Sequence, residues 1–198
     1  AYRGLNNSDI MMGNIQLNYK KLFANSRLDA LALVEGQNYS YEGFGSNARG
    51  FDTNYFGYNN LKAGALVKHG DVSSYKNEYS LNSFLGRVNY IISDKYIATA
   101  NIRFDGSSKL GENNKWGFFP SASLAWIMSE EGFLKDVDAV DNFKWRVGYG
   151  RTGNQDAISA YNSLSLMGPS GITTVNGVQT VTYAYNSNSN PDLKWETK

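Results

Sequence analysis

The chain has 198 residues, enough for one domain with its own core. Its 19 Lys and Arg nearly balance its 18 Asp and Glu, which leaves no excess of cations to neutralise a phosphate backbone and disfavours nucleic-acid binding. There is no Cys and a single His, His69, which excludes disulfides, thiol nucleophiles and multi-histidine metal centres. The longest unbroken apolar runs have five residues, whereas a membrane-spanning helix needs about 20.

The rest of the composition is typical of strands joined by polar loops. The chain combines 23 Asn, 20 Ser and 20 Gly with 14 Tyr, 10 Phe and 4 Trp. Aromatic residues favour pleated sheets, whereas Asn, Gly and Ser favour turns. A hydrophobic content of 41% argues against disorder. The composition therefore predicts an all-β protein.

Alternation of apolar and polar residues predicts six strands. In chain order they cover residues 15–20, 28–34, 84–92, 98–105, 121–126 and 143–150. The second of these is more apolar and less regular than the others. The third and fourth are separated only by the polar turn 93–95, which predicts an antiparallel hairpin.

The connections between these strands alternate in length. Short ones are expected at 23–27 and 93–95, a medium one at 129–142, and long ones at 36–76, 106–115 and 152–191. An up-and-down outer-membrane barrel has this pattern, with short periplasmic turns and long outer loops, whereas a sandwich has short turns every 8–12 residues. Apolar and polar residues also alternate along the strands of a soluble sheet with one buried face. A soluble β-sandwich that binds polysaccharide is therefore the alternative.

In the barrel interpretation, each strand has one face toward lipid and one toward the water-filled lumen. The residues expected to face lipid are Val88, Tyr90, Ala100, Ile102, Phe104, Leu124, Trp126, Trp145 and Val147. Those expected to face the lumen in a structural role are Arg87, Asn89, Asn101, Arg103, Asp105, Lys144 and Arg146. Arg103 and Asp105 share a face and are close enough to pair.

No enzymatic activity, metal or cofactor is expected. The adjacent acids Glu130 and Glu131 fit a solvated turn, and the acids of 136–141 lack the Gly and distal Glu of a calcium loop. With His69 as the only imidazole, a Ser/His/Asp set is implausible. Ligand recognition, if present, is expected in the long loops, where Tyr39, Tyr41 and Phe44 are the candidates because aromatic faces stack on sugar rings.

From Leu81 onward the sequence resembles the SusC/RagA family of TonB-dependent outer-membrane transporters. The order and spacing of several segments carry this resemblance: Asn82–Tyr90, Asp94–Tyr96, Arg103–Ser108, Asn113–Ser121, Trp126, Ser129–Glu131, Lys144–Gly150, Thr152–Asn154 and Asn190–Glu196. Residues 1–80 fit more loosely, as a hairpin and a long outer loop.

The resemblance implies a segment of a large plugged barrel. Such a segment would supply about six strands, without the plug, the TonB-contacting segment or the closing C-terminal strand. It implies a place in the outer membrane of a Gram-negative, Bacteroidetes-type cell, in contact with its lipid. It also implies import of oligosaccharide or peptide, together with a SusD-like surface lipoprotein and the TonB system.

Overall fold

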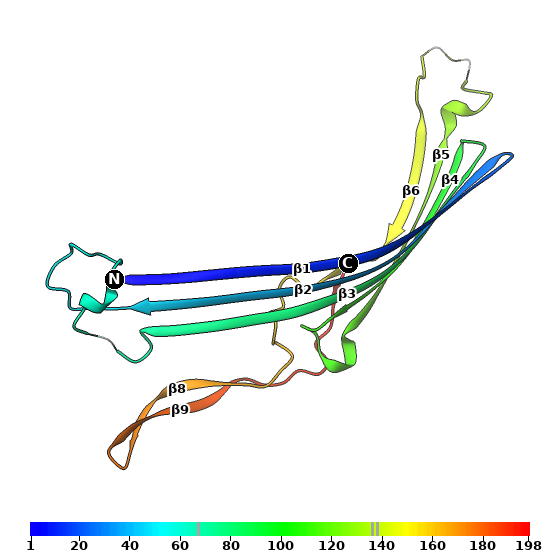
Figure 1. Cartoon of the computed structure of the whole chain (residues 1–198). Coiled ribbons are helices and arrows are strands. Elements are labelled where there is room, and N and C mark those ends of the chain that lie inside the picture. Colours follow the sequence, from blue (N-terminus) through cyan, green and yellow to red (C-terminus); the bar gives the residue numbers. More distant parts are fainter. Residues whose placement is uncertain (67, 136, 138) are drawn as a thin grey trace. The chain divides into compact units, whose positions relative to one another are not determined.

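A computed structural model describes residues 1–66, 68–135, 137 and 139–198. Six antiparallel strands form one sheet in which the order in space is the order in the chain (Figure 1). This confirms the predicted all-β, up-and-down arrangement. The strands are β1 (Tyr2–Phe23), β2 (Ser26–Asn47), β3 (Val72–Ile92), β4 (Tyr96–Ser107), β5 (Trp116–Ile127) and β6 (Lys144–Gly150).

Helical structure in the described ranges is limited to three single turns of 3₁₀ type. They are η1 (Leu61–Ala63), η2 (Glu112–Asn114) and η3 (Met128–Glu130). None of the helices in the part of the chain that the structure describes is long or apolar enough to cross a membrane.

The chain divides into two compact units. The first unit consists of residues 1–11 and 37–80, and the second of residues 12–36 and 81–198. The first holds one part of β1, β2 and β3 with the loop 48–71. The second holds the other part of these strands, together with β4, β5, β6 and everything that follows.

The two short connections are as tight as predicted. Only Ala24 and Asn25 separate β1 from β2, and residues 93–95 separate β3 from β4. Ser93 and Asp94 both have positive φ, of 53° and 56°. Asp tolerates the left-handed region better than most residues, and paired positive φ angles match the twist of a hairpin.

The predicted long connections 36–76 and 152–191 are wrong in extent. Strand β2 continues to Asn47 and β3 begins at Val72, so the loop between them covers only 48–71. The Gly, Asn and Ser residues of 37–47 are typical of loops. Within this stretch, however, Gln37, Tyr39 and Tyr41 occupy alternate positions, so they can pack side by side on one face of a sheet that is exposed to water. The connection after β6 contains the hairpin β8 (Leu166–Val175) and β9 (Val178–Ser187).

The hairpin of β8 and β9 turns at Asn176 and Gly177, both with positive φ. It forms a separate two-stranded sheet, drawn in orange in Figure 1. No charged residue occurs between Asp156 and Asp192 in the sequence. A second short ladder joins β7 (Gly153–Asn154) to β10 (Glu196–Thr197).

The buried core of the second unit is small and lies where β3, β4 and β5 meet the segments after them. Leu110 is 1% exposed and Phe119 is 7% exposed. The ring of Phe119 meets Trp195 edge-on, with centroids 5.4 Å apart. The Trp195 indole also donates a 3.2 Å hydrogen bond to the carbonyl of Lys115. Residues 190–195 are thereby fixed against β5 and the loop before it.

Candidate functional site

One face of β3, β4 and β5 in the second unit carries a row of hydrogen-bonded polar side chains. The strand register places Arg87 opposite Asn101, and Asn101 opposite Ser121. Arg87 Nε donates to Asn101 Oδ1 at 2.7 Å, and Asn101 Nδ2 donates to Ser121 Oγ at 3.0 Å. Three strands are therefore linked side chain to side chain as well as through their backbones.

The same face holds an ion pair that the sequence predicts. Arg103 Nε lies 2.8 Å from both carboxylate oxygens of Asp105, and Arg103 Nη2 donates to Ser83 Oγ at 3.1 Å. Asp105 and Ser83 are buried. The predicted pairing of Arg103 with Asp105 is confirmed.

The remaining predicted polar residues share this face. Thr99 Oγ1 donates to Asn89 Oδ1 at 2.8 Å across β3 and β4. Lys144 and Arg146 lie opposite Ile127 and Ala125 in the β5–β6 register, which puts them on the same face as Ser121. All seven residues expected at a lumen wall thus point to one side of the sheet.

This polar face is hollowed by a groove of about 570 Å³ in the second unit. The side chains of Arg87, Asn101 and Arg103 line it, together with Trp195 and residues 150–156. Gln155 Oε1 is buried there without a hydrogen-bond partner among the described residues. Leu81, Leu85 and Phe119 also line the groove, which therefore combines hydrogen-bond donors with apolar surface.

The opposite face of the second unit is apolar and open to its surroundings. Register rows bring together Phe84, Phe104 and Phe118, with the Phe104 and Phe118 ring centroids 4.7 Å apart. Ile102 is 51% exposed and Leu124 is 58% exposed. All nine residues expected to face lipid have side chains on this face: Val88, Tyr90, Ala100, Ile102, Phe104, Leu124, Trp126, Trp145 and Val147.

A shallow groove of about 400 Å³ extends this apolar face over the neighbouring strands. Leu17 and Tyr19 of β1, Ala30 and Ala32 of β2, and Val88 line it. Almost all of the surface of this groove is therefore aliphatic or aromatic. An exposed apolar face of this width needs a nonpolar environment to cover it.

Glu131, next to the turn end of the apolar face, holds two strands together through their aromatic residues. Its carboxylate accepts hydrogen bonds from the Tyr96 hydroxyl at 2.6 Å, from Lys95 Nζ at 3.1 Å and from the Trp126 indole at 3.1 Å. These three donors, Tyr96 first, hold the pKa of Glu131 below its usual value. The expectation of a simply solvated acid at this position is wrong.

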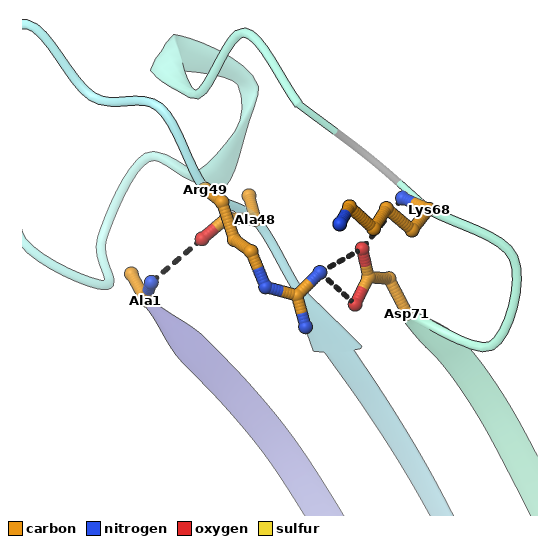
Figure 2. A network of polar contacts seen from close by, with 5 residues as sticks. All are labelled: Ala1, Ala48, Arg49, Lys68 and Asp71. Carbon is orange, nitrogen blue, oxygen red and sulfur yellow. Dashed lines mark hydrogen bonds and ion pairs between the residues drawn. The ribbon is translucent and has the colours of Figure 1, made fainter.

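In the first unit, an ion pair closes the base of the loop 48–71 (Figure 2). Arg49 Nη1 lies 2.7 and 2.6 Å from the two carboxylate oxygens of Asp71, and the backbone N–H of Lys68 donates to Asp71 at 2.6 Å. Asp71 is buried. The Lys68 N–H and the Arg49 guanidinium hold the pKa of Asp71 below its usual value, against the opposing effect of burial.

Backbone hydrogen bonds support this ion pair on both sides. Arg49 pairs with Leu66 through two reciprocal bonds of 3.0 Å, and Asn47 donates to the carbonyl of Asp71 at 2.8 Å. Ala48 and Ala1 exchange further backbone bonds, one of which is drawn in Figure 2. The two ends of the loop are thus held together, while its aromatic tip is open and Tyr55 is 87% exposed.

The three ligand candidates from the sequence do not lie in a loop. Tyr39, Tyr41 and Phe44 all belong to β2. Tyr39 and Tyr41 contact Tyr79 and Tyr75 of β3, whereas Phe44 lines a groove of about 430 Å³ with Leu5, Glu42 and Lys76. The structure therefore separates the two tyrosines from Phe44. Sequence reasoning missed the tyrosines of β3, which only strand pairing brings to β2.

Nothing in the described ranges assembles a metal site. No three His, Asp or Glu side chains within them come close enough together to hold an ion. Asp136 and Asp138, from the acidic stretch considered above, lie outside the described residues.

Comparison with known proteins shows the family to which the chain belongs. The family model for the TonB dependent receptor-like β-barrel matches residues 2–197. The chain belongs to this family. TonB-dependent receptor P3 of Formosa agariphila is 43% identical over 91% of the chain, and TonB-dependent receptor SusC of Bacteroides thetaiotaomicron is 34% identical over 72%. The chain is a TonB-dependent receptor segment of the SusC/RagA type, as the resemblance implied.

The solved RagAB peptide transporter has the same fold. Its TM-score is 0.79, with 23% identity over 99% of this chain and 21% of that one. The TonB-dependent receptor segment also spans only 18% of the length of P3 and 14% of that of SusC. Receptors of this family are outer-membrane proteins.

Proposed function

We propose that this TonB-dependent receptor segment forms part of the wall and outer surface of an outer-membrane importer. The receptor would take up glycans or peptides with a SusD-like surface lipoprotein, driven by TonB, in a Bacteroidetes-type cell. SusC and the RagAB transporter, among its relatives, support this assignment. The segment contributes structure and recognition, and no catalysis.

The difference between the two faces of the second unit carries this proposal. On one side, Ile102 and Leu124 leave broad aliphatic and aromatic surface uncovered. On the other, Arg87 donates a hydrogen bond to Asn101, Arg103 donates to Asp105 and Ser83, and Arg87, Asn101 and Arg103 line an open groove. In this arrangement the apolar face contacts lipid and the polar face borders the lumen, the two environments of an outer-membrane strand.

The same distribution argues against the soluble sandwich. A sandwich needs a second sheet packed on the apolar face, about 10 Å away. The six strands instead form one sheet in sequential order, and Leu124 of β5, which has a strand on each side, is more than half exposed. No observation in the described residues favours the sandwich.

Neighbouring residues on one strand provide the test. In the full-length receptor, Leu124→Arg places a charge on the apolar face, at a cost of about 2–4 kcal/mol near the membrane midplane. Ser123→Arg places the same charge on the polar face, opposite Gly148 of β6 and the small polar side chain of Thr99 of β4. We expect Leu124→Arg to reduce the folded, heat-modifiable receptor in outer-membrane fractions strongly, and Ser123→Arg to leave most of it.

A second pair, Val88→Arg and Asn89→Arg on β3, repeats the comparison on another strand. Equal effects of the two members of both pairs would contradict the assignment of the faces. A receptor found only in soluble fractions would contradict the outer-membrane location itself.

A further inference from the structure

The strands of the first unit have one charged face and one uncharged face. Lys76 Nζ pairs with Glu78 Oε1 at 2.8 Å, and Glu42 lines the same groove as Lys76. Because side chains alternate along a strand, residues 39, 41, 75 and 79 point to the opposite face. In strand residues 2–11, 37–47 and 72–80, all of which the structure describes, every charged residue belongs to the first face.

The uncharged face is built from tyrosine pairs across β2 and β3. Tyr39 and Tyr79 have ring centroids 4.9 Å apart, and those of Tyr41 and Tyr75 are 5.5 Å apart. Tyr2 of β1 lies over the neighbouring part of β2, 2.9 Å from where a Cβ on Gly45 would be. We call the set Tyr2, Asn6, Tyr39, Tyr41, Tyr75 and Tyr79 the tyrosine face.

Two buried glycines make room for the rings of Tyr75 and Tyr2 close to the backbone of β2. A Cβ on Gly43 would lie only 2.5 Å from Tyr75 Cζ, closer than side chains allow. Gly45 leaves the corresponding space for Tyr2. Tyr75 and Tyr2 are nevertheless 45% and 61% exposed, so much of each side chain is accessible to a ligand.

Polar groups lie at the edge of this surface. The Tyr75 hydroxyl hydrogen bonds with Asn6 Oδ1 at 3.1 Å and with the Tyr41 hydroxyl at 2.9 Å. A linked row of phenol and amide groups therefore borders the exposed rings. Neutral donors and acceptors placed around an apolar surface are the usual means by which a binding site fixes the orientation of a small ligand.

We propose that the tyrosine face binds the pyranose rings of an uncharged oligosaccharide. A pyranose has C–H groups on its broad faces, which the negative face of an aromatic ring attracts, and hydroxyls at its edge. The phenol and amide row matches those hydroxyls. A peptide brings charged termini and side chains, and this face has no charged group to pair with them.

This inference rests on the proposed function, in which glycans and peptides both stand as solutes, and it selects glycans. The two rings of each tyrosine pair come from adjacent strands, so the surface is rigid before the ligand arrives. A rigid aromatic surface loses little conformational entropy on binding.

The test uses the full-length receptor, purified in detergent, on an array of neutral hexose oligosaccharides, uronate-containing oligosaccharides and peptides. We expect binding to neutral oligosaccharides. Tyr75→Ala should raise the dissociation constant for the tightest of these about tenfold or more, as truncation of a central aromatic contact does. Gly43→Ala, which keeps every tyrosine but displaces the Tyr75 ring, should weaken binding in the same direction.

Phe44→Ala is the matched control, because it removes an aromatic ring from the same strand on the charged face. It should change the dissociation constant by less than about twofold. Tyr75→Phe, which keeps the ring and removes the hydroxyl, should have an effect between these two. The amount of each variant in outer-membrane fractions shows that it folds.

Three results would overturn the inference: binding only to peptides or uronates, no binding to any neutral oligosaccharide, or equal binding by wild type and the well-folded Tyr75→Ala and Gly43→Ala variants. Each of these leaves the outer-membrane assignment standing. The outer-membrane assignment is tested separately: it fails if the unmodified receptor is found only in soluble fractions.

Discussion

The Tyr96 hydroxyl donates a 2.6 Å hydrogen bond to Glu131, a residue 35 positions further along the chain. The ring of Tyr96 also stacks on Trp126 of the adjacent strand, and the Trp126 indole donates to the same carboxylate oxygen. One carboxylate thus fixes the polar ends of two aromatic side chains. Aromatic residues with polar tips are typical of the boundary between membrane and water.

Glu131→Gln should destabilise the folded receptor at neutral pH. The amide keeps the shape of the side chain but loses the charge that three donors stabilise, including Lys95. We expect a lower urea midpoint in lipid vesicles at pH 7, with an unchanged dependence on urea concentration. Glu130→Gln, at the exposed neighbour, is the control and should have little effect.

The effect of Glu131→Gln should also depend on pH in a defined direction. Because folding lowers the pKa of Glu131, its stabilising contribution is complete above the pKa of the unfolded chain and is lost as the pH falls through the lower folded value. The difference in midpoint between wild type and variant should therefore shrink on acidification. A difference that grew at low pH would contradict this account.

Arg49→Met should loosen the loop 48–71 without unfolding the receptor. The substitution leaves the buried Asp71 carboxylate with the Lys68 N–H but without its guanidinium partner. Chymotrypsin should then cleave near the exposed Tyr55 about tenfold faster, because the free energy of local opening of the loop is lower. Lys62→Met, in η1 of the same loop, should leave the cleavage rate near that of wild type.

Arg103 and Asp105 should be strongly coupled. Arg103→Met removes both bonds to the buried Asp105 and should cost about 1–3 kcal/mol of unfolding free energy. Asp105→Asn in the same background should recover part of that loss, because no unpaired charge is left. Additive effects in the double-mutant cycle, measured by urea unfolding, would show that the two side chains do not interact.

Gly111→Ala should displace the segment 190–195. Its Cβ would collide with the carbonyl of Pro191, next to the 2.9 Å hydrogen bond from Gly111 N–H to Leu193. We expect a loss of about 1–3 kcal/mol and faster hydrogen exchange in residues 190–195. At Gly132, where the surroundings are open, the same substitution should have neither effect.

The sheet and its two faces could be predicted because alternation with a period of two sets which side each residue points to. Arg87 and Val88 therefore fall on opposite faces in both the sequence pattern and the strand register. The same logic gave the Arg103–Asp105 pair, whose members are two residues apart on one strand.

Other features could not be predicted because they depend on distant partners or on glycines that look like turns. Gly43 and Gly45 lie within the connection expected over 36–76, yet they are strand residues whose missing side chains make room for tyrosine rings. Glu131 has partners that only the pairing of β4 with β5 brings near it. Arg49 and Asp71 lie in polar sequence without periodicity, so no pattern connects them.

Aromatic residues on the apolar face of β4 and β5 are separated by a fixed distance along the strands. Tyr96 and Phe104 lie eight residues apart on β4, about 27 Å along the strand, and less along the membrane normal once the strand tilts. Each of these two residues lies opposite an aromatic residue of β5: Tyr96 opposite Trp126, and Phe104 opposite Phe118. The two pairs form two aromatic rows across the strands. In the proposed arrangement, where this face contacts lipid, the backbone fixes this distance, and a thicker bilayer must thin around the barrel or make its strands stand more upright. The receptor should therefore insert and stay folded best in lipids whose hydrocarbon thickness matches the spacing of these two rows.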